Sequence, residues 1–221
     1  MPTELLDILS ELDRLEKDLI KKIPASLEAE SLIWGAWLSH ITGIGAVLAA
    51  QLVHLIKGQV HTDECKVERE RYFSKKRLGE SLRGLYVCDC PVKEIERFPT
   101  VSSLWKYAGL HVVNGKAPKM KRGEKVDWNP KLRSLCWKIS DSFVKKRDSP
   151  YRKYYDEFKA MEKQKNPELR LRHIDMRARR KTVKLFLAHL FSKWYELKGL
   201  KAPEPYPFSM LGHEGYIPPP K

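Results

Sequence analysis

The stretch "ITGIGAVLAAQL", residues 41–52, places Gly43 and Gly45 directly before an alanine-rich apolar segment. Glycine lacks a Cβ, so it permits a positive φ or a close backbone approach, whereas residues 46–52 are good helix formers. The preceding "SLIWGAWLSH" carries apolar side chains at helical spacing. The stretch therefore predicts two helices joined by a tight glycine turn, a helix-hairpin-helix motif over residues 31–57.

This turn is a candidate anion-binding site. The backbone N–H groups of Gly43, Ile44 and Gly45 would face a phosphate of DNA at the positive end of the second helix. The alternative is a tightly packed helix–helix corner that binds no ligand. A dinucleotide fingerprint does not fit, because it needs a preceding strand and a third glycine.

Composition favours a folded protein that binds an anionic polymer. The chain has 221 residues, of which 42% are hydrophobic, and six tryptophans can fill a core. Lys and Arg number 42 against 28 Asp and Glu, and this excess of +14 favours nucleic acid as the partner. The absence of a secretory signal pattern or a long apolar run predicts a cytoplasmic, nucleoid-associated protein without a membrane partner.

The N-terminal 24 residues predict a helical arm. Its apolar side chains alternate at steps of three and four, the seam of a coiled coil, at Leu5, Ile8, Leu12, Leu15 and Leu19. Pro24 is expected to end this helix. The arm either forms a homodimer or packs against the chain's own helices.

The pattern of residues 25–200 predicts one all-α domain with a solvated helix over 66–85. A short helix should start at a Thr100 or Ser102 cap and end at Gly109, before a strand-like "LHVV". Asn129 and Pro130 should begin a helix that buries one face, made of Leu132, Leu135, Cys136, Ile139 and Phe143. The Pro-rich tail, residues 201–221, should be extended.

Two basic clusters are further candidates for DNA contact. The first lies in a loop and comprises Lys116, Lys119, Lys121, Arg122 and Lys125. The second lies on one face of the last long helix and comprises His173, Arg177, Arg180, Lys181 and Lys184, with Arg179 beside them. The buried stripe of that helix is expected at Met176, Val183, Leu187, Leu190 and Trp194. Each cluster has a simpler interpretation as a solvated surface.

The sequence predicts no cofactor and no catalytic residue. A zinc site is the one cofactor alternative that the residue pattern offers. The pairs "HTDEC" and "CDC" supply His61, Cys65, Cys88 and Cys90, which could converge on tetrahedral zinc. Ordinary reduced thiols are the alternative and the expected outcome. Trp105, Tyr107, Trp128 and Trp137 could stack on bases, although core packing is the expected role.

Several ordered blocks resemble the C-terminal transposase domain of the Piv-type insertion-sequence recombinases, and archaeal members most closely. These blocks are "ITGIGAVLAAQL", "FPTVSSLWKYAGL", "GKAPKMKRGEKVDWNPKLRSLCWKI" and "RARRKTVKLFLAHLF". The resemblance covers residues 41–197 and implies DNA recombination guided by a structured RNA. Residues 57–97 are longer than the family's usual connection at this place, so the resemblance makes them a candidate insertion. It also implies a helical domain that grips nucleic acid and supplies a serine nucleophile.

Two departures from that family limit what the resemblance implies. The family's N-terminal nuclease-like domain, with its acidic metal site, has no counterpart here. Asn114 precedes Gly115 where many members carry serine, and an amide is not a hydroxyl nucleophile. We therefore expect a DNA-binding protein of recombination or transposition without complete catalytic machinery, with structured RNA as a second partner. The alternatives are an active recombinase or nuclease subunit that borrows a partner's metal site, and a chromatin-like packaging protein.

Overall fold

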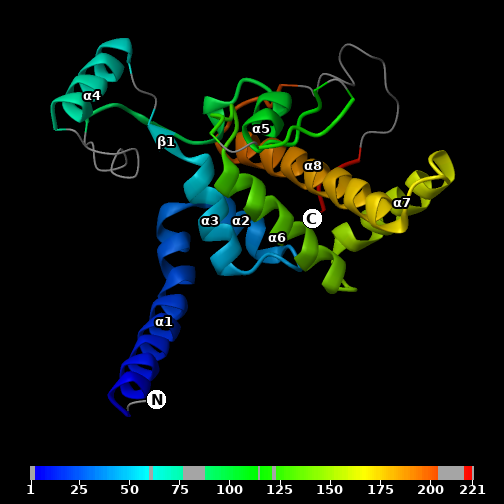
Figure 1. Cartoon of the computed structure of the whole chain (residues 1–221), viewed down its shortest axis with the longest axis horizontal. Helices are drawn as coiled ribbons and strands as arrows, with labels where there is room; N and C mark the ends of the chain where they lie inside the picture. The colour runs from blue at the N-terminus through cyan, green and yellow to red at the C-terminus, as the bar shows by residue number, and fades with distance from the viewer. Residues whose placement is uncertain are drawn as a thin grey trace. The chain divides into compact units, whose positions relative to one another are not determined.

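The computed structural model describes residues 3–59, 62–76, 88–113, 115–120, 123–203 and 217–220. These residues are mostly helical, which confirms the predicted all-α fold (Figure 1). They divide into a main unit, Met1–Leu55 with Phe98–Lys221, and a small unit, Ile56–Arg97. None of the described helices is long and apolar enough to cross a membrane.

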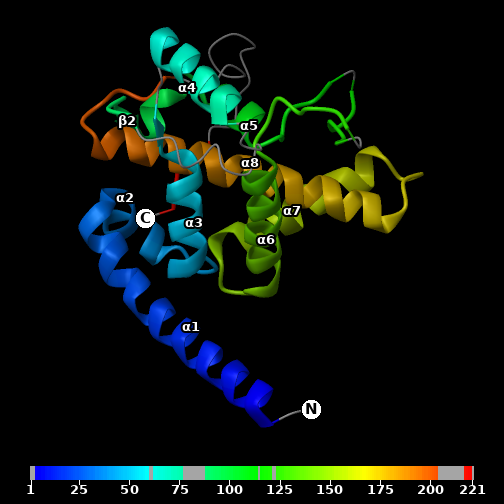
Figure 2. The same ribbon diagram turned by 60° about the vertical axis from the view of Figure 1, so that its left-hand side comes forward.

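The main unit is built around one long helix. Its elements are α1 (Thr3–Glu30), α2 (Leu32–Ala36), the 3₁₀ helix η1 (Leu38–His40), α3 (Ala46–Ile56), α5 (Val101–Tyr107), α6 (Pro130–Lys145), α7 (Pro150–Lys165) and α8 (Leu171–Leu197). Helix α8 contacts α2, α5, α6 and α7, and Figure 2 shows it beside α6 and α7. The core of the unit therefore lies along α8.

The predicted buried faces of α6 and α8 are largely confirmed. All five apolar residues expected inside α6 are buried, and Asn129 caps the helix by accepting from the Leu132 N–H at 3.0 Å. On α8, Val183, Leu187, Leu190 and Trp194 are buried, but Met176 is 42% exposed. Including Met176 in the buried stripe was wrong, because its side chain lines a surface hollow between α6 and α8.

The region around α5 is confirmed in part. Thr100 and Ser103 form a reciprocal capping box at the helix start, and Gly109 follows the helix with a φ of 66°. The predicted strand at "LHVV" is wrong, because residues 110–112 form no regular structure. Val113 forms only an isolated bridge with Lys116.

The N-terminal arm differs from its prediction at its end. Helix α1 continues through Pro24 to Glu30, so Pro24 as a stop was wrong. Proline removes one backbone hydrogen bond, and on this exposed helix water can satisfy the freed carbonyl. Packing of the arm on the chain's own helices is also wrong, because the seam residues are exposed: Leu5, Ile8, Leu12, Leu15 and Leu19. Dimerisation stays a prediction.

The small unit contains a two-stranded sheet and one helix. Strand β1 (Gly58–Gln59) pairs antiparallel with β2 (Val92–Lys93), followed by the 3₁₀ helix η3 (Ile95–Arg97). Helix α4 (Asp63–Lys76) begins three residues before the charged helix that the sequence predicts, and residues 77–87 lie outside the described part. The unit's bounds are close to those of the candidate insertion, residues 57–97.

Two backbone carbonyls of the C-terminal residues 217–220 accept hydrogen bonds from buried side chains. His189 Nε2 lies 2.8 Å from the carbonyl oxygen of Ile217, and Trp37 Nε1 donates to that of Pro220 at 2.9 Å. Residues 204–216 of the Pro-rich tail lie outside the described residues. The end of the tail is therefore tied to the main unit by two polar groups of its core.

Candidate nucleic-acid interface

The glycine turn is positioned by packing against α6. Gly43 has a φ of 104°, and a Cβ at this position would lie 2.9 Å from Cδ1 of Phe143. Ser142 Oγ also donates to the Gly43 carbonyl at 2.7 Å. Both the backbone conformation and the packing therefore require glycine at this position.

The three residues of the predicted phosphate site have different environments. The Ile44 N–H donates to the Ile41 carbonyl at 2.9 Å, and the Ile44 side chain is buried, so its amide is already engaged within the turn. Gly45 is exposed, and a Cβ there would meet nothing within 4 Å. Its carbonyl accepts from the Ala49 N–H, which places Gly45 at the head of α3. Phosphate binding at this turn stays a prediction.

Matched serine replacements separate the roles of the two glycines. We expect Gly43→Ser to destabilise the protein by about 1–3 kcal/mol, because it combines backbone strain with a clash against Phe143. Gly45→Ser should change stability by less than about 0.5 kcal/mol, since its Cβ enters open space and serine caps helices well. Urea unfolding of both variants measures the difference. Equal losses would contradict this assignment.

The predicted basic loop lies next to α6. Lys116, Lys119 and Lys125 are exposed, whereas Lys121 and Arg122 lie outside the described residues. Arg133 of α6 donates to the Pro118 carbonyl at 2.8 Å and so ties the loop to this helix. This contact thus holds Pro118, next to the exposed Lys119, near the start of α6.

Part of the predicted basic face of α8 is paired with a buried carboxylate on α7. Glu162 is 6% exposed and accepts from Lys181 at 2.5 Å and from Arg177 at 3.2 Å. Burial acts to raise the pKa of Glu162, but these two cations outweigh it and the pKa is lowered. Lys181 and Arg177 therefore hold α8 against α7, which reduces the charge they offer to a ligand.

Other cations of α8 also have partners within the fold. Arg180 donates to the carbonyls of Leu110 and His111, and Lys184 Nζ lies 4.0 Å from the ring centroid of Trp105. Burial, with a smaller contribution from Arg180, lowers the pKa of Lys184 to about 8. Arg179 pairs with Asp175 at 2.8 Å and with Asp141 at 3.1 Å. His173 is exposed.

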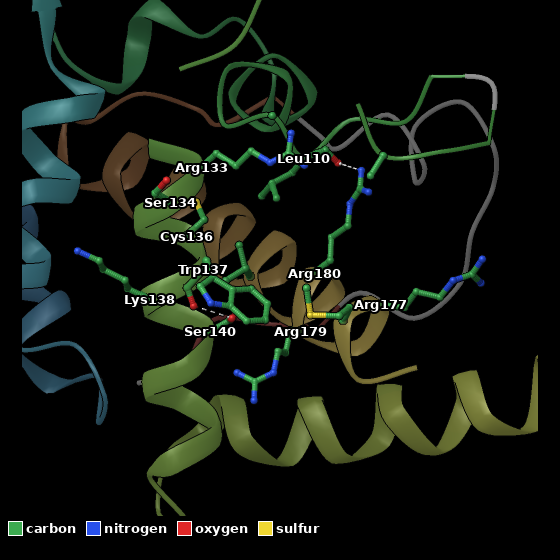
Figure 3. Close-up of a pocket in the computed structure, with 14 residues that line it drawn as sticks. Leu110, Arg133, Ser134, Cys136, Trp137, Lys138, Ser140, Arg177, Arg179 and Arg180 are labelled. Carbon is green, nitrogen blue, oxygen red and sulfur yellow. Dashed lines mark hydrogen bonds between the residues drawn. The ribbon is translucent and has the colours of Figure 1, made fainter. Parts of the chain in front are cut away.

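A surface hollow of about 570 Å³ lies between α6, α8 and the loop after α5, and we call it the tryptophan hollow. Its cationic lining residues are Arg133, Lys138, Arg177, Arg179 and Arg180, and no carboxylate is among the described residues that line it. Trp137, which is 44% exposed, projects into it from α6 (Figure 3). The guanidinium of Arg179 lies 5.1 Å from the centroid of this ring. The hollow combines a flat aromatic surface with positive charge.

A second hollow of about 470 Å³ lies on the other side of α6, towards α3, and we call it the lysine hollow. It is lined by Gln51, His54, Leu55, Pro130, Lys131, Ser134, Leu135 and Lys138. Lys131 and Lys138 are exposed and seven residues apart, about 10 Å along the helix axis. In Figure 3, Lys138 points away from Trp137, towards this side of α6. Ser134 and Lys138 line both hollows.

The sequence contained a signal for Trp137 and Lys138. The buried face of α6 includes Leu135, Cys136 and Ile139. Residues 137 and 138 fall off that face at 3.6 residues per turn, so their exposure follows from the helical period. Assigning Trp137 to the core was therefore wrong. Trp105 and Trp128 are partly exposed as well.

The structure describes three of the four candidate zinc ligands. The sulfur atoms of Cys65, Cys88 and Cys90 all lie within 4.8 Å of one another, whereas His61 lies outside the described residues. Burial, and then hydrogen bonds with the other two thiols, raise the pKa of Cys65 to about 12. The cysteine cluster belongs to the small unit.

Comparisons of this chain with protein families, with curated proteins and with solved structures found no match.

Proposed function

We propose that this chain binds nucleic acid, foremost DNA, through the sugar–phosphate backbone, and that it acts in DNA recombination or transposition. The observation that carries the proposal is the tryptophan hollow, where cationic side chains of α6 and α8 surround a half-exposed indole. Guanidinium and ammonium groups bind phosphates, and an exposed indole stacks on a base. The sequence resemblance to Piv-type recombinases supports recombination as the setting.

The unpaired lysines on both sides of α6 extend this surface. Lys116 and Lys119 on the loop, and Lys131 and Lys138 on α6, are exposed and form no ion pair within the described residues. Several other basic residues of the predicted footprint are held by carboxylates or carbonyls. We infer that these four lysines provide most of the phosphate contacts and that the paired cations shape the surface.

The salt dependence of binding tests this proposal. If the four lysines each neutralise one phosphate, log affinity should fall with log salt with a slope of about −3.6. Affinity for duplex DNA should then drop on the order of 100-fold between about 50 and 200 mM salt. Fluorescence anisotropy with labelled duplex DNA, single-stranded DNA and structured RNA measures the slope and identifies the preferred partner. Salt-independent affinity, or no binding at low salt, would refute the proposal.

A further inference from the structure

The described part of the small unit buries few apolar side chains. Its buried apolar residues within the described part are Ile56, Cys65 and Ile95. The strands β1 and β2 are two residues each, and an isolated two-stranded pair is marginal in water. The other described interactions in the unit include the Lys57–Glu94 ion pair at 2.9 Å and a hydrogen bond from Arg97 to the Ile56 carbonyl. With so few buried apolar side chains in its described part, the unit would be stabilised by a cross-link.

The cysteine cluster lies where a cross-link would join the two halves of this unit. Cys65 belongs to the first turn of α4, where its backbone N–H donates to Thr62 Oγ1 at 3.2 Å. Cys88 and Cys90 belong to the segment that leads into β2. Bonds from Cys65 to this segment would connect the start of the helix to the sheet and link two parts of the chain that are 23 or more residues apart in sequence.

The spacing of the three sulfur atoms fits one metal ion. Tetrahedral zinc binds thiolates at about 2.3 Å, which places the sulfurs about 3.8 Å apart. The three Sγ atoms already lie within 4.8 Å of one another, so small side-chain movements suffice. A disulfide would join only two of these sulfurs and leave the third outside the bond.

We propose that the small unit contains a structural zinc site whose ligands include the thiolates of Cys65, Cys88 and Cys90. Each thiol loses its proton on binding, and Zn²⁺ keeps its charge and oxidation state. Three sulfur ligands leave one position of the tetrahedron for a further side chain or a water molecule. This site shares no residue with the proposed DNA surface, so either proposal can fail without the other.

Metal analysis of the full chain tests the site. We expect the reduced protein to bind about one Zn²⁺ per chain. Titration with Co²⁺ should produce the strong near-ultraviolet absorption of thiolate-to-metal charge transfer and the visible bands of tetrahedral cobalt. Cys88→Ser and Cys90→Ser should each weaken Zn²⁺ binding at least tenfold. Cys136→Ala, which removes a buried thiol of α6, is the matched control and should leave the stoichiometry unchanged.

Hydrogen exchange provides a second readout that needs no variant. Removing Zn²⁺ with a chelator should increase amide exchange at least tenfold in residues 62–76 and 88–97, and leave α6 and α8 protected. The proposal is overturned if the reduced wild-type chain binds neither Zn²⁺ nor Co²⁺, or if the cobalt spectrum lacks thiolate bands. It is also overturned if two of the three cysteines form a disulfide in the purified protein and no metal is bound.

Discussion

Replacing Lys131 and Lys138 together with alanine should weaken DNA binding at least tenfold. Both side chains are exposed on α6 and line the lysine hollow, and neither forms an ion pair within the described residues, so their charge is available to phosphates. Loss of two phosphate contacts should also reduce the salt slope by about 1.8, half of the value expected for the whole surface. Anisotropy titrations at several salt concentrations measure both quantities.

The matched control is Lys163→Ala with Lys165→Ala, at the end of α7. These lysines are also exposed and line neither hollow. Replacing both of them removes the same net charge as replacing Lys131 and Lys138. Their loss should change affinity by less than about threefold, since only the general electrostatic field of the protein is reduced. Equal losses from the two lysine pairs would mean that net charge, and no particular surface, drives binding.

Trp137→Ala should weaken the binding of single-stranded DNA more than that of duplex DNA, because it removes a stacking surface and no charge.

Features set by local chemistry were accessible from the sequence. The caps at Thr100 and Asn129 and the buried face of α6 each depend on residues close in the chain, and the structure confirms them. The same helical period could have identified Trp137 as exposed. Pro24 was a weaker signal, because an exposed helix tolerates one missing hydrogen bond.

Features set by distant partners were not accessible. The basic face of α8 is visible in the sequence, but the pairing of Lys181 and Arg177 with Glu162 depends on how α7 packs against α8. Gly43 requires glycine because Phe143, from another helix, occupies the space of a Cβ. The approach of Cys65 to Cys88 and Cys90 likewise depends on the path of the chain between them.

The second large effect concerns pH and a buried imidazole. His189 is 3% exposed, and its Nδ1 lies 2.8 Å from the Tyr151 hydroxyl and its Nε2 lies 2.8 Å from the Ile217 carbonyl oxygen. The neutral ring satisfies both contacts when Nε2–H donates to the carbonyl and Nδ1 accepts from the hydroxyl. Burial lowers the pKa of His189 from 6.5 to about 4, although the Ile217 carbonyl favours the charged form. Tyr151 remains neutral, because burial raises its pKa well above 10.0.

Acidification should therefore destabilise the folded protein before the ion pairs of Glu162, Asp175 and Asp141 are lost. Between pH 6.5 and about 4 the unfolded chain binds a proton at His189 that the folded chain does not, so the free energy of unfolding falls as the pH falls. The full loss is about 3 kcal/mol, since each pKa unit corresponds to about 1.4 kcal/mol. The pKa values of Glu162, Asp175 and Asp141 are lowered in the folded protein. The highest ordinary pKa among these three groups is 4.5, for Glu162, so their stabilising contributions are lost only below about pH 4.5.

Urea unfolding at pH 7, 6, 5 and 4.5 measures this dependence in the wild-type chain and in His189→Gln. Glutamine keeps a hydrogen-bond donor and an acceptor but does not titrate. The free energy of unfolding of the His189→Gln variant should therefore vary much less over this pH range, although it starts from a lower value at pH 7. The matched control is His54→Gln, at an exposed position of α3, which should retain the wild-type pH dependence. If His189→Gln loses stability on acidification as steeply as the wild type, the imidazole is not the group responsible. The acid sensitivity would then belong to groups outside the contact of His189 with Tyr151 and Ile217.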